Sequence, residues 1–325
     1  MVRGWILLAV LVVLCLTAGS AWGSFPGRNG KIVYGWTGES AYRAGPAATS
    51  IRDVDPRSGH VRVLRDCPLR ERIYTDCTVS APRYSPDGQT IAFPAIRIVA
   101  DPVQPWQYWP GFGTMAHDGT AFEEHTTARR YWALAWSPAG DRFLVERGLG
   151  PVDPWPSSIF LASLDGTELS RVTPQWTEAP DWSSTGHVAF GRYRDLYCRP
   201  DCENIWLMRL GGTPRRLTYR GGHSPSWSPR GTKLAFVRAR SRRGVVRRDI
   251  YIVRRDGRGL RRLTRRGGDS PSWSPDGRWI AFIRDGDVYV LRSTGDGLRR
   301  LVNAPPPDFE VPTVTSLDWQ PLPRR

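Results

Sequence analysis

Short apolar runs alternate along most of this chain with turns that contain glycine, proline or aspartate. The pattern is clearest in residues 271–302, where four runs rich in β-forming residues follow one another. The Pro-Asp-Gly sequence at 275–277 suits a tight turn, because proline presets φ, aspartate can bond its own backbone and glycine accepts a positive φ. The apolar residues on both sides of this turn predict a hairpin. Two more runs, at 288–291 and 298–302, extend the hairpin to a predicted sheet of four antiparallel strands.

The same pattern returns at a nearly constant period. Its fullest copy reads Pro-Ser-Trp-Ser-Pro-Asp-Gly at 271–277 and continues with Trp-Ile-Ala-Phe at 279–282. The aromatic residues at the centre of the copies are Tyr84, Trp136, Trp182, Trp227, Trp273 and Trp319. They are spaced by 52, 46, 45, 46 and 46 residues, which is the period of a propeller blade and too long for a leucine-rich repeat. We expect the repeated tryptophans to pack within the blades rather than to bind a ligand.

The two ends of the chain hold the two halves of one further copy. Residues 25–34 read FPGRNGKIVY and match the second half, whereas residues 317–321 read LDWQP and match the first half. Joined, they form a composite blade whose inner strand comes from the C-terminus, and this pairing covers two exposed sheet edges and closes the ring. The sequence therefore predicts an all-β fold, a six-bladed β-propeller of four-stranded antiparallel blades closed by a composite N-/C-terminal blade.

The phrase P-x-W-S-P-D-G-x-x-I-A-F, followed by an I-Y-[VIL]-x strand and a G-x-x-R-L-T strand, resembles the propeller repeat of TolB-type periplasmic proteins. The R-L-T element occurs at 216–218 and 262–264. The resemblance covers nearly all of residues 25–321 and implies a single TolB-like propeller domain over residues 24–325. The sequence departs from the repeat at two places: the blade that begins near Tyr84 has no clean third strand, and the copy around Trp182 lacks Pro-Asp.

The N-terminus has the pattern of an export signal. Arg3 precedes an apolar run of 13 residues at 5–17, and Ala-Trp-Gly at 21–23 resembles a signal-peptide cleavage site. At about 1.5 Å per residue this run is shorter than a hydrocarbon core of about 30 Å, so an uncleaved membrane anchor is the less favoured alternative. We therefore expect residues 1–23 to be a signal peptide. The mature protein is then secreted or associated with the periplasm and cell envelope, without a stable membrane span.

Cleavage of the signal leaves four cysteines in the mature chain. They are Cys67, Cys77, Cys198 and Cys202. An even number of cysteines in an exported chain indicates disulfides. Three pairings are possible, and proximity in the sequence favours Cys67–Cys77 with Cys198–Cys202. The spacing is a poor match to a zinc site of four thiolates, so we expect neither a metal nor another cofactor.

The positive charge of the chain is concentrated in one sector. The formal net charge is +15, and residues 214–300 alone carry +16, from 22 arginines and one lysine against seven aspartates. In one interpretation the near-exclusive use of arginine reflects a GC-rich coding bias. In the other, the sector attracts anionic polymers or an anionic surface. Because export separates the protein from nucleic acids, we do not expect a nucleic-acid partner.

Antiparallel strand order also predicts where a binding site lies. If the strands of a blade are labelled A to D from the axis outward, the A–B and C–D turns lie on one face of the ring. The B–C and D–A connections lie on the other face. The A–B and C–D turns are short here, whereas the irregular segments and both proposed disulfides fall in the second class, on what we call the long-loop face. Loops on a rigid scaffold are the usual place for recognition.

Two connections on the long-loop face carry the candidate binding residues. The segment 100–113 contributes an aromatic cluster, whose rings can stack on sugars or pack against a partner, or else only plug the rim. The segment 238–248 contributes arginines that can hold carboxylates or phosphates with two hydrogen bonds, or else is a solvated loop. The candidates are Trp106, Tyr108, Trp109, Arg242, Arg243, Arg247 and Arg248.

No catalytic constellation is evident in the sequence. It lacks the G-x-S-x-G nucleophile elbow of α/β-hydrolases, and its five histidines do not show H-x-x-x-H spacing. We therefore predict an exported, monomeric, non-catalytic binding or scaffold propeller that recognises a protein, a peptide or an anionic glycan through its long-loop face. The alternative is a metal-dependent propeller lyase or hydrolase acting on an acidic polysaccharide, for which His125, His187 and His223 would have to meet near the axis.

Overall fold

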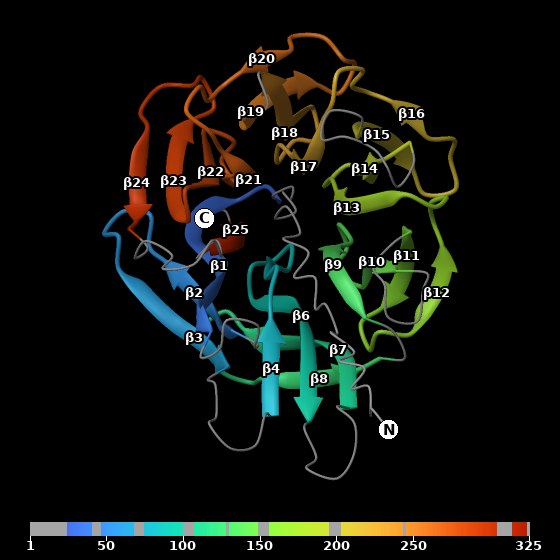
Figure 1. Cartoon of the computed structure of the whole chain (residues 1–325), viewed down its shortest axis with the longest axis vertical. Helices are drawn as coiled ribbons and strands as arrows, with labels where there is room; N and C mark the ends of the chain where they lie inside the picture. Colours follow the sequence, from blue (N-terminus) through green and yellow to red (C-terminus); the bar gives the residue numbers. More distant parts are fainter. Residues whose placement is uncertain are drawn as a thin grey trace, which may run out of the picture.

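The chain folds into a ring of six β-sheets around a central axis (Figure 1). This computed structural model describes residues 25–40, 47–67, 75–99, 107–127, 130–148, 156–194, 203–242, 245–303 and 314–323. Within these residues there are 25 strands and no helix. The ring confirms the all-β, six-bladed propeller that the repeat predicts.

Each blade is named by its place in the chain, and its strands are given from the axis outward. The composite blade contains β25 (Val314–Leu322), β1 (Arg28–Ser40), β2 (Ala47–Val54) and β3 (Val61–Cys67). Blade 1 contains β4 (Thr75–Val79), β5 (Arg83–Tyr84), β6 (Thr90–Val99), β7 (Gln107–Ala116) and β8 (Glu123–Thr126). Blade 2 contains β9 (Tyr131–Trp136), β10 (Arg142–Gly148), β11 (Ser157–Ser163) and β12 (Glu168–Arg171).

The second half of the ring repeats this order. Blade 3 contains β13 (Thr177–Trp182), β14 (His187–Arg192), β15 (Asn204–Arg209) and β16 (Arg215–Arg216). Blade 4 contains β17 (His223–Trp227), β18 (Lys233–Arg242), β19 (Val245–Arg254) and β20 (Arg261–Arg262). Blade 5 contains β21 (Asp269–Trp273), β22 (Trp279–Arg284), β23 (Asp287–Arg292) and β24 (Arg299–Val302).

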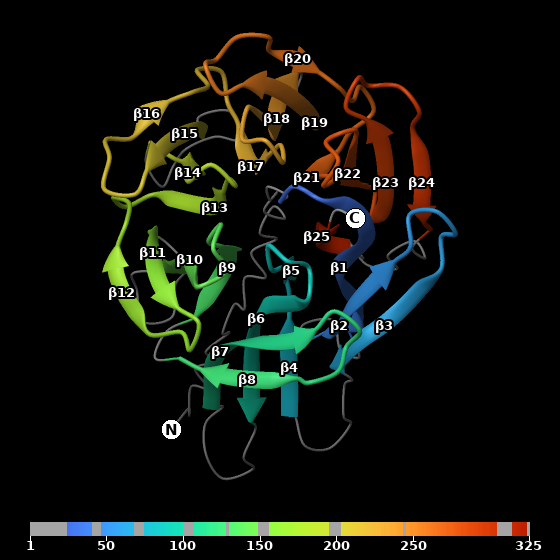
Figure 2. The ribbon, with the colours of Figure 1, turned by 180° about the vertical axis from the view of Figure 1, so that it is seen from behind.

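Strands β25 and β1 close the ring as the sequence predicts. They pair antiparallel, with Ile32 opposite Trp319 and Tyr34 opposite Leu317. Both views of the ring show β25 beside β1 (Figures 1 and 2). The indole Nε1 of Trp319 donates a hydrogen bond to the carbonyl oxygen of Gly30 at 3.2 Å. The C-terminal segment therefore supplies the inner strand of a blade whose other three strands come from the N-terminal segment.

The hydrophobic core lies mainly between neighbouring blades. The repeated tryptophans are buried, and the exposed fractions of Trp227 and Trp273 are 0% and 2%. Trp227 belongs to one apolar cluster with Ile205 and Leu207 of blade 3 and with Phe236 of its own blade. Each blade therefore covers an apolar face of its neighbour.

The A–B turn of the repeat phrase is held by its own polar side chains. In blade 5, Ser274 Oγ donates a hydrogen bond to Asp276 Oδ1 at 2.6 Å and accepts one from the Trp279 N–H at 2.8 Å. Gly277 has a φ of 73°, in the left-handed region that glycine adopts without strain. The Ser-Pro-Asp-Gly sequence thus recurs because it builds this turn.

The R-L-T element ties the outer strand of a blade to its third strand. In blade 4, Thr264 Oγ1 accepts a hydrogen bond from the Ile250 N–H at 2.9 Å. Arg262 donates to the Thr264 carbonyl oxygen at 2.8 Å and to the carboxylate of Asp249 at 2.7 Å. Part of the arginine excess of the sequence is therefore used inside the blades.

The inner strands of four blades have a bulge immediately before the first proline of the phrase. The residues before that proline have positive φ angles of 45–50° and are Ala81, Ala179, Ser224 and Ser270. A proline lacks an N–H for the strand ladder, so a bulge suits its position. In blade 1 the bulge separates β4 from β5, and both pair with β6. Cys77, which the sequence placed in a connection on the long-loop face, therefore belongs to an inner strand.

The sequence assigned two segments to long B–C loops, and the described residues of both belong to strands. Strands β6 and β7 are ten residues each and pair along their whole length. Blade 1 thus has a complete third strand, and the prediction that it lacks one was wrong. Pro110, Gly111 and Gly113 hide the strand pattern of β7 in the sequence, but pairing with β6 outweighs their low β-propensity. Strands β18 and β19 likewise pair over ten residues, so the segment 238–248 is mostly a hairpin.

Candidate functional site

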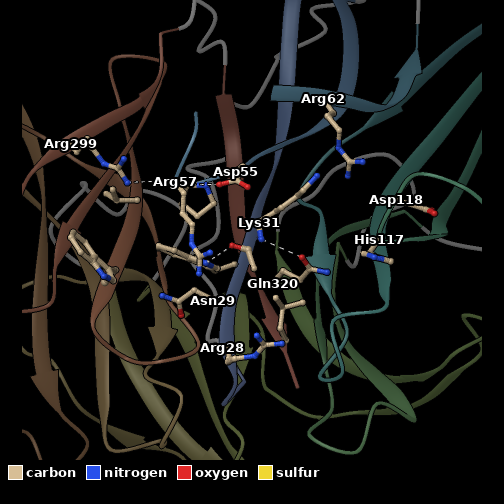
Figure 3. Close-up of a pocket in the computed structure, with 16 residues that line it drawn as sticks. Arg28, Asn29, Lys31, Asp55, Arg57, Arg62, His117, Asp118, Arg299 and Gln320 are labelled. Atoms are coloured by element: carbon tan, nitrogen blue, oxygen red, sulfur yellow. Dashed lines mark hydrogen bonds between the residues drawn. The ribbon is translucent and has the colours of Figure 1, made fainter. Parts of the chain in front are cut away.

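A cavity of about 760 Å³ lies at the seam of the ring (Figure 3). Its walls come from the start of β1, the β2–β3 turn, the β7–β8 turn, the starts of β22 and β24, and the end of β25. All of these lie on the face of the A–B and C–D turns, which we call the short-turn face. The composite blade and both of its neighbours therefore contribute, and the volume suits a small-molecule ligand.

The lining of this cavity is positively charged. Its basic side chains are Arg28, Lys31, Arg57, Arg62 and Arg299, with His117 beside them. The carboxylates in the lining are Asp55 and Asp118, and both accept hydrogen bonds within their own turns. The N–H of Arg57 lowers the pKa of Asp55, and the hydroxyl and N–H of Thr120 lower the pKa of Asp118. Both carboxylates are thus ionised and already used by the turns.

A buried carboxylate holds two of the cavity's cations in place. Asp53 in β2 is 0% exposed, and it forms ion pairs with Lys31 Nζ at 3.3 Å and with the guanidinium of Arg62, whose Nε donates at 3.1 Å. A buried carboxylate without such partners would be strongly disfavoured. One negative charge therefore faces two positive charges at the cavity wall, which leaves a net positive charge there.

A second cavity on the short-turn face has the opposite character. It has a volume of about 380 Å³ and lies between blades 1 and 2. Among the described residues, its ionisable lining consists of Asp87, Glu123 and His125, and no arginine or lysine lines it. Of the two cavities, the one at the seam is therefore the one lined by arginine and lysine.

The long-loop face carries a separate group of arginines on the β18–β19 hairpin. We call residues 238–242 and 245–248 of this hairpin the arginine ribbon. Arg240 lies directly opposite Arg247, and both are exposed. Arg238 is buried instead, with its guanidinium 4.9 Å from the ring centre of Tyr251. The ribbon thus changes from packed to solvent-exposed as it leaves the blade.

Further exposed side chains extend the charge of the ribbon. Arg220, Arg265 and Arg266 lie in the D–A connections that follow blades 3 and 4, and all are exposed. Val245 and Val246, at the tip of the ribbon, are 58% and 43% exposed. The end of the ribbon therefore presents apolar side chains among cations.

The structure separates the two groups of candidate residues. Arg247 and Arg248 are exposed residues of β19, and Arg242 is the last residue of β18. Both strands belong to blade 4. Tyr108 and Trp109 lie in β7 of blade 1, on the other side of the ring (Figure 1). The candidates outside the described residues are Trp106 and Arg243. The aromatic and arginine candidates that can be placed therefore do not form one site.

The proposed disulfides stay predictions. Cys67 is the last residue of β3 and is buried, and Cys77 lies in β4, the strand of the next blade that contacts β3. Cys198 and Cys202 lie outside the described residues.

The three histidines of the enzymatic alternative do not meet at the axis. His125 lies in β8, the outermost strand of blade 1, His187 begins the second strand of blade 3, and His223 begins the inner strand of blade 4. The described part of the chain contains no group of three or more His, Cys, Asp or Glu residues that could hold a metal ion. The repeat had placed these histidines at similar positions along the chain, but their distance from the axis depends on the strand they occupy.

A group of carboxyls lies between blades 2 and 3 and was not predicted from the sequence. Glu146 in β10 and Glu203 just before β15 are buried, and Glu178 in β13 is partly buried beside them. Burial raises the pKa of Glu146 to about 8 and also raises the pKa values of Glu178 and Glu203. Glu146 Oε2 accepts the Ala179 N–H at 2.9 Å, and Glu178 and Glu203 are hydrogen-bonded to each other. We call these three residues the glutamate cluster.

None of the residues that line the seam cavity was predicted from the sequence as a binding residue. The basic residues of the cavity lie between positions 28 and 299, and no motif connects them. The one available signal for the glutamate cluster was Glu146, because the equivalent residue in the other blades is glycine, proline or aliphatic. Neither the seam cavity nor the glutamate cluster could be recognised in the sequence, because the sequence does not show how far each residue lies from the axis.

No helix in the described residues has the length and apolar character needed to cross a membrane. Neither a protein-family model nor a curated protein matches this sequence.

The fold, by contrast, is similar to that of many solved structures. TolB from Acinetobacter baumannii matches with a TM-score of 0.66 and 17% identity, over 92% of this chain and 68% of that chain. A putative TolB from Agrobacterium tumefaciens matches with a TM-score of 0.57 and 20% identity, over 85% and 89% of the two chains. The acylaminoacyl peptidase of Pyrococcus horikoshii matches with a TM-score of 0.53 and 12% identity, over 88% of this chain and 46% of that chain. At these identities the likeness concerns the fold: this chain is a six-bladed β-propeller of the kind found in TolB-like structures.

Proposed function

We propose that this chain is an exported, non-catalytic binding propeller that holds an anionic partner on the arginine ribbon of its long-loop face. The partner is a protein, a peptide or a glycan. The observation that carries the proposal is the pair formed by Arg240 and Arg247, two exposed arginines directly opposite each other in neighbouring strands. No carboxylate of the described residues forms an ion pair with either of them.

The electrostatic repulsion between Arg240 and Arg247 supports the proposal that an anionic ligand binds here. Like charges directly opposite each other across a strand pair destabilise a sheet, by about 0.2–1 kcal/mol on the scale of such pairs. The hairpin does not need these charges to form, because the strands pair along the whole register. An anionic partner would offset the repulsion, and each guanidinium can bind a carboxylate or phosphate with two hydrogen bonds.

Other features agree with a docking role. The exposed valines at the ribbon tip would add apolar contact to the charge–charge attraction. Propellers recur in the similar structures both as TolB and as part of a peptidase. Export through the signal at residues 1–23 and a monomeric state belong to this proposal as well, and residues 1–23 lie outside the described part of the chain.

The test measures binding to a fluorescent polyglutamate peptide and to a fluorescent oligogalacturonate, at low and high salt. We expect the variant Arg240→Glu/Arg247→Glu to lose about tenfold or more in affinity at low salt, and the wild type to weaken at high salt because salt screens exposed charges. The matched control is Arg230→Glu/Arg258→Glu, which reverses two exposed arginines of the same blade on the short-turn face. Equal losses in the two variants, or no loss in the ribbon variant, would contradict the proposal.

A further inference from the structure

We propose that the basic cavity at the seam is a second ligand site. It takes a small molecule with two or more phosphate or carboxylate groups, and its occupation holds the ring closed. The site lies on the face opposite the arginine ribbon, so it does not depend on the proposed function. Three features carry the inference: the surplus of positive charge in a concave site, the arrangement of the cations in two groups, and the origin of the lining in both ends of the chain.

The positive charge of the cavity exceeds what its own carboxylates neutralise. Five basic side chains line the cavity against two carboxylates, and those two are already hydrogen-bonded within their turns. No carboxylate of the described residues forms an ion pair with Arg28, Arg57 or Arg299. Cations on the walls of a cleft focus their field into it and attract an anion more strongly than the same cations on an open surface.

Four of the five cations form two groups. Lys31 and Arg62 share the carboxylate of Asp53, which holds their charged groups next to each other. Arg299 donates a hydrogen bond to the backbone of the β2–β3 turn, beside Arg57. Figure 3 shows Arg62 and Arg299 on opposite sides of the view. Two separate positive groups suit a ligand with two anionic ends, each held by charge-assisted hydrogen bonds.

The cavity is assembled from segments that are far apart in the sequence. Arg28 and Lys31 belong to β1 near the N-terminus, Gln320 belongs to β25 near the C-terminus, and Arg299 belongs to blade 5. The side chain of Gln320 already bridges the seam, since its Oε1 accepts the Lys31 N–H at 3.3 Å and its Nε2 donates to the Gly88 carbonyl oxygen at 2.9 Å. The complete site therefore exists only while β25 and β1 are paired.

A ligand in this position would stabilise the closed ring. A ligand that binds the native state and not the opened state adds a stability of RT ln(1 + [L]/Kd). The seam is the place where this matters most, because β25 and β1 are the two ends of the described chain. In the other five blades, neighbouring strands are instead linked through a local turn or loop.

The first experiment uses the mature full-length chain and two compounds that differ in the source of the anion, pyrophosphate and trigalacturonate. Calorimetric titration at low salt gives the affinity, and thermal unfolding gives the midpoint with and without the compound. We expect at least one compound to bind and to raise the midpoint. The variant Arg57→Gln/Arg299→Gln is expected to bind it about tenfold more weakly, and it keeps the fold because both side chains are exposed. Binding of pyrophosphate alone identifies a phosphate ligand, and binding of trigalacturonate alone identifies an acidic glycan.

The matched control is Arg230→Gln/Arg258→Gln, which removes two exposed arginines from the short-turn face of blade 4. We expect this variant to keep the wild-type affinity. If neither compound binds the wild type, or if the control loses as much affinity as the cavity variant, the cavity is not a ligand site.

Ring closure is measured separately by hydrogen exchange. The bound compound is expected to slow exchange of the backbone amides in β1 and β25 more than in β22 and β23 of blade 5. Equal slowing in both places would overturn the claim that occupation of the site holds the ring closed.

Discussion

Blades 3 and 4 follow the same repeat but carry opposite chemistry at their long-loop ends. Glu178 and His223 both stand four residues before the repeat tryptophan of their inner strand. Glu203 and Arg248 both stand two residues before the first buried isoleucine of their third strand. In blade 3 these positions bring carboxyls together beside Glu146 of blade 2. In blade 4 the lengthened third strand carries an exposed arginine into the arginine ribbon.

The difference shows which positions the repeat constrains. Thr218 and Thr264 hold the third strands of the two blades with the same hydrogen bond to an isoleucine N–H, at 2.9 Å in both. Trp227, between these blades, is fully buried. Residues at the strand ends take no part in these contacts, so one and the same position holds the buried acid Glu203 in blade 3 and the exposed base Arg248 in blade 4. The contacts that hold the strands of a blade together are therefore the same in both blades, while the residues at the long-loop end differ.

The largest expected effect comes from removing the packing that both blades share. The substitution Trp227→Ala leaves a cavity in the apolar cluster between blades 3 and 4, and we expect it to lower the free energy of unfolding by about 3–5 kcal/mol. Denaturant titration measures this loss. The control Tyr219→Ala changes a side chain that is 72% exposed and is expected to cost less than about 0.5 kcal/mol. Similar losses for the two variants would show that packing between blades 3 and 4 at Trp227 does not stabilise the fold more than an exposed side chain does.

A smaller effect is expected from pH, and it comes from the glutamate cluster between blades 2 and 3. In the unfolded chain the carboxyl of Glu146 has a pKa near 4.5, whereas burial in the folded chain raises that pKa to about 8. Between these values the unfolded state binds fewer protons than the folded state, so stability falls as the pH rises. We expect a loss of a few kcal/mol between about pH 5 and pH 8, because one pKa unit corresponds to about 1.4 kcal/mol.

The substitution Glu146→Gln separates this effect from other titrations. The amide keeps an oxygen to accept the Ala179 N–H but cannot ionise, so the dependence of unfolding free energy on pH becomes flatter. The control Glu124→Gln changes an exposed carboxyl of β8 and leaves the slope as in the wild type. Parallel curves for all three proteins would mean that Glu146 does not titrate with folding.

The smallest expected effect tests how blade 3 makes room for its carboxyls. A Cβ atom at Gly191 would lie 2.0 Å from Glu203 Oε1, whereas the equivalent residue of blade 4 is Val237, which is accommodated in the core. We expect Gly191→Ala to cost about 1–3 kcal/mol. The cost should be smaller in a Glu203→Ala background, which a double-mutant cycle of denaturant titrations measures. An equal cost in both backgrounds would exclude Glu203 as the obstacle.

The features that could be predicted from the sequence are those with local, repeated signals. The turns around Gly277 and its counterparts and the strands beside them were found because both depend on neighbouring residues. The third strand of blade 1 was not found, because Pro110 and Gly111 obscure its alternation and only pairing with β6 establishes it. The exposed arginines of β19 were singled out from composition, but their placement on a paired hairpin came from the register.

The period of the repeat and the two half-copies at the chain ends were enough to establish the number of blades and the closure of the ring, since turn chemistry and strand alternation act over a few residues. Folding was needed to bring Arg57 beside Arg299 at the seam, and Glu146 near Glu203 between two blades. These groupings depend on how far each side chain lies from the axis and which blade it faces. Residues distant in the sequence acquire those relations only when the blades pack together.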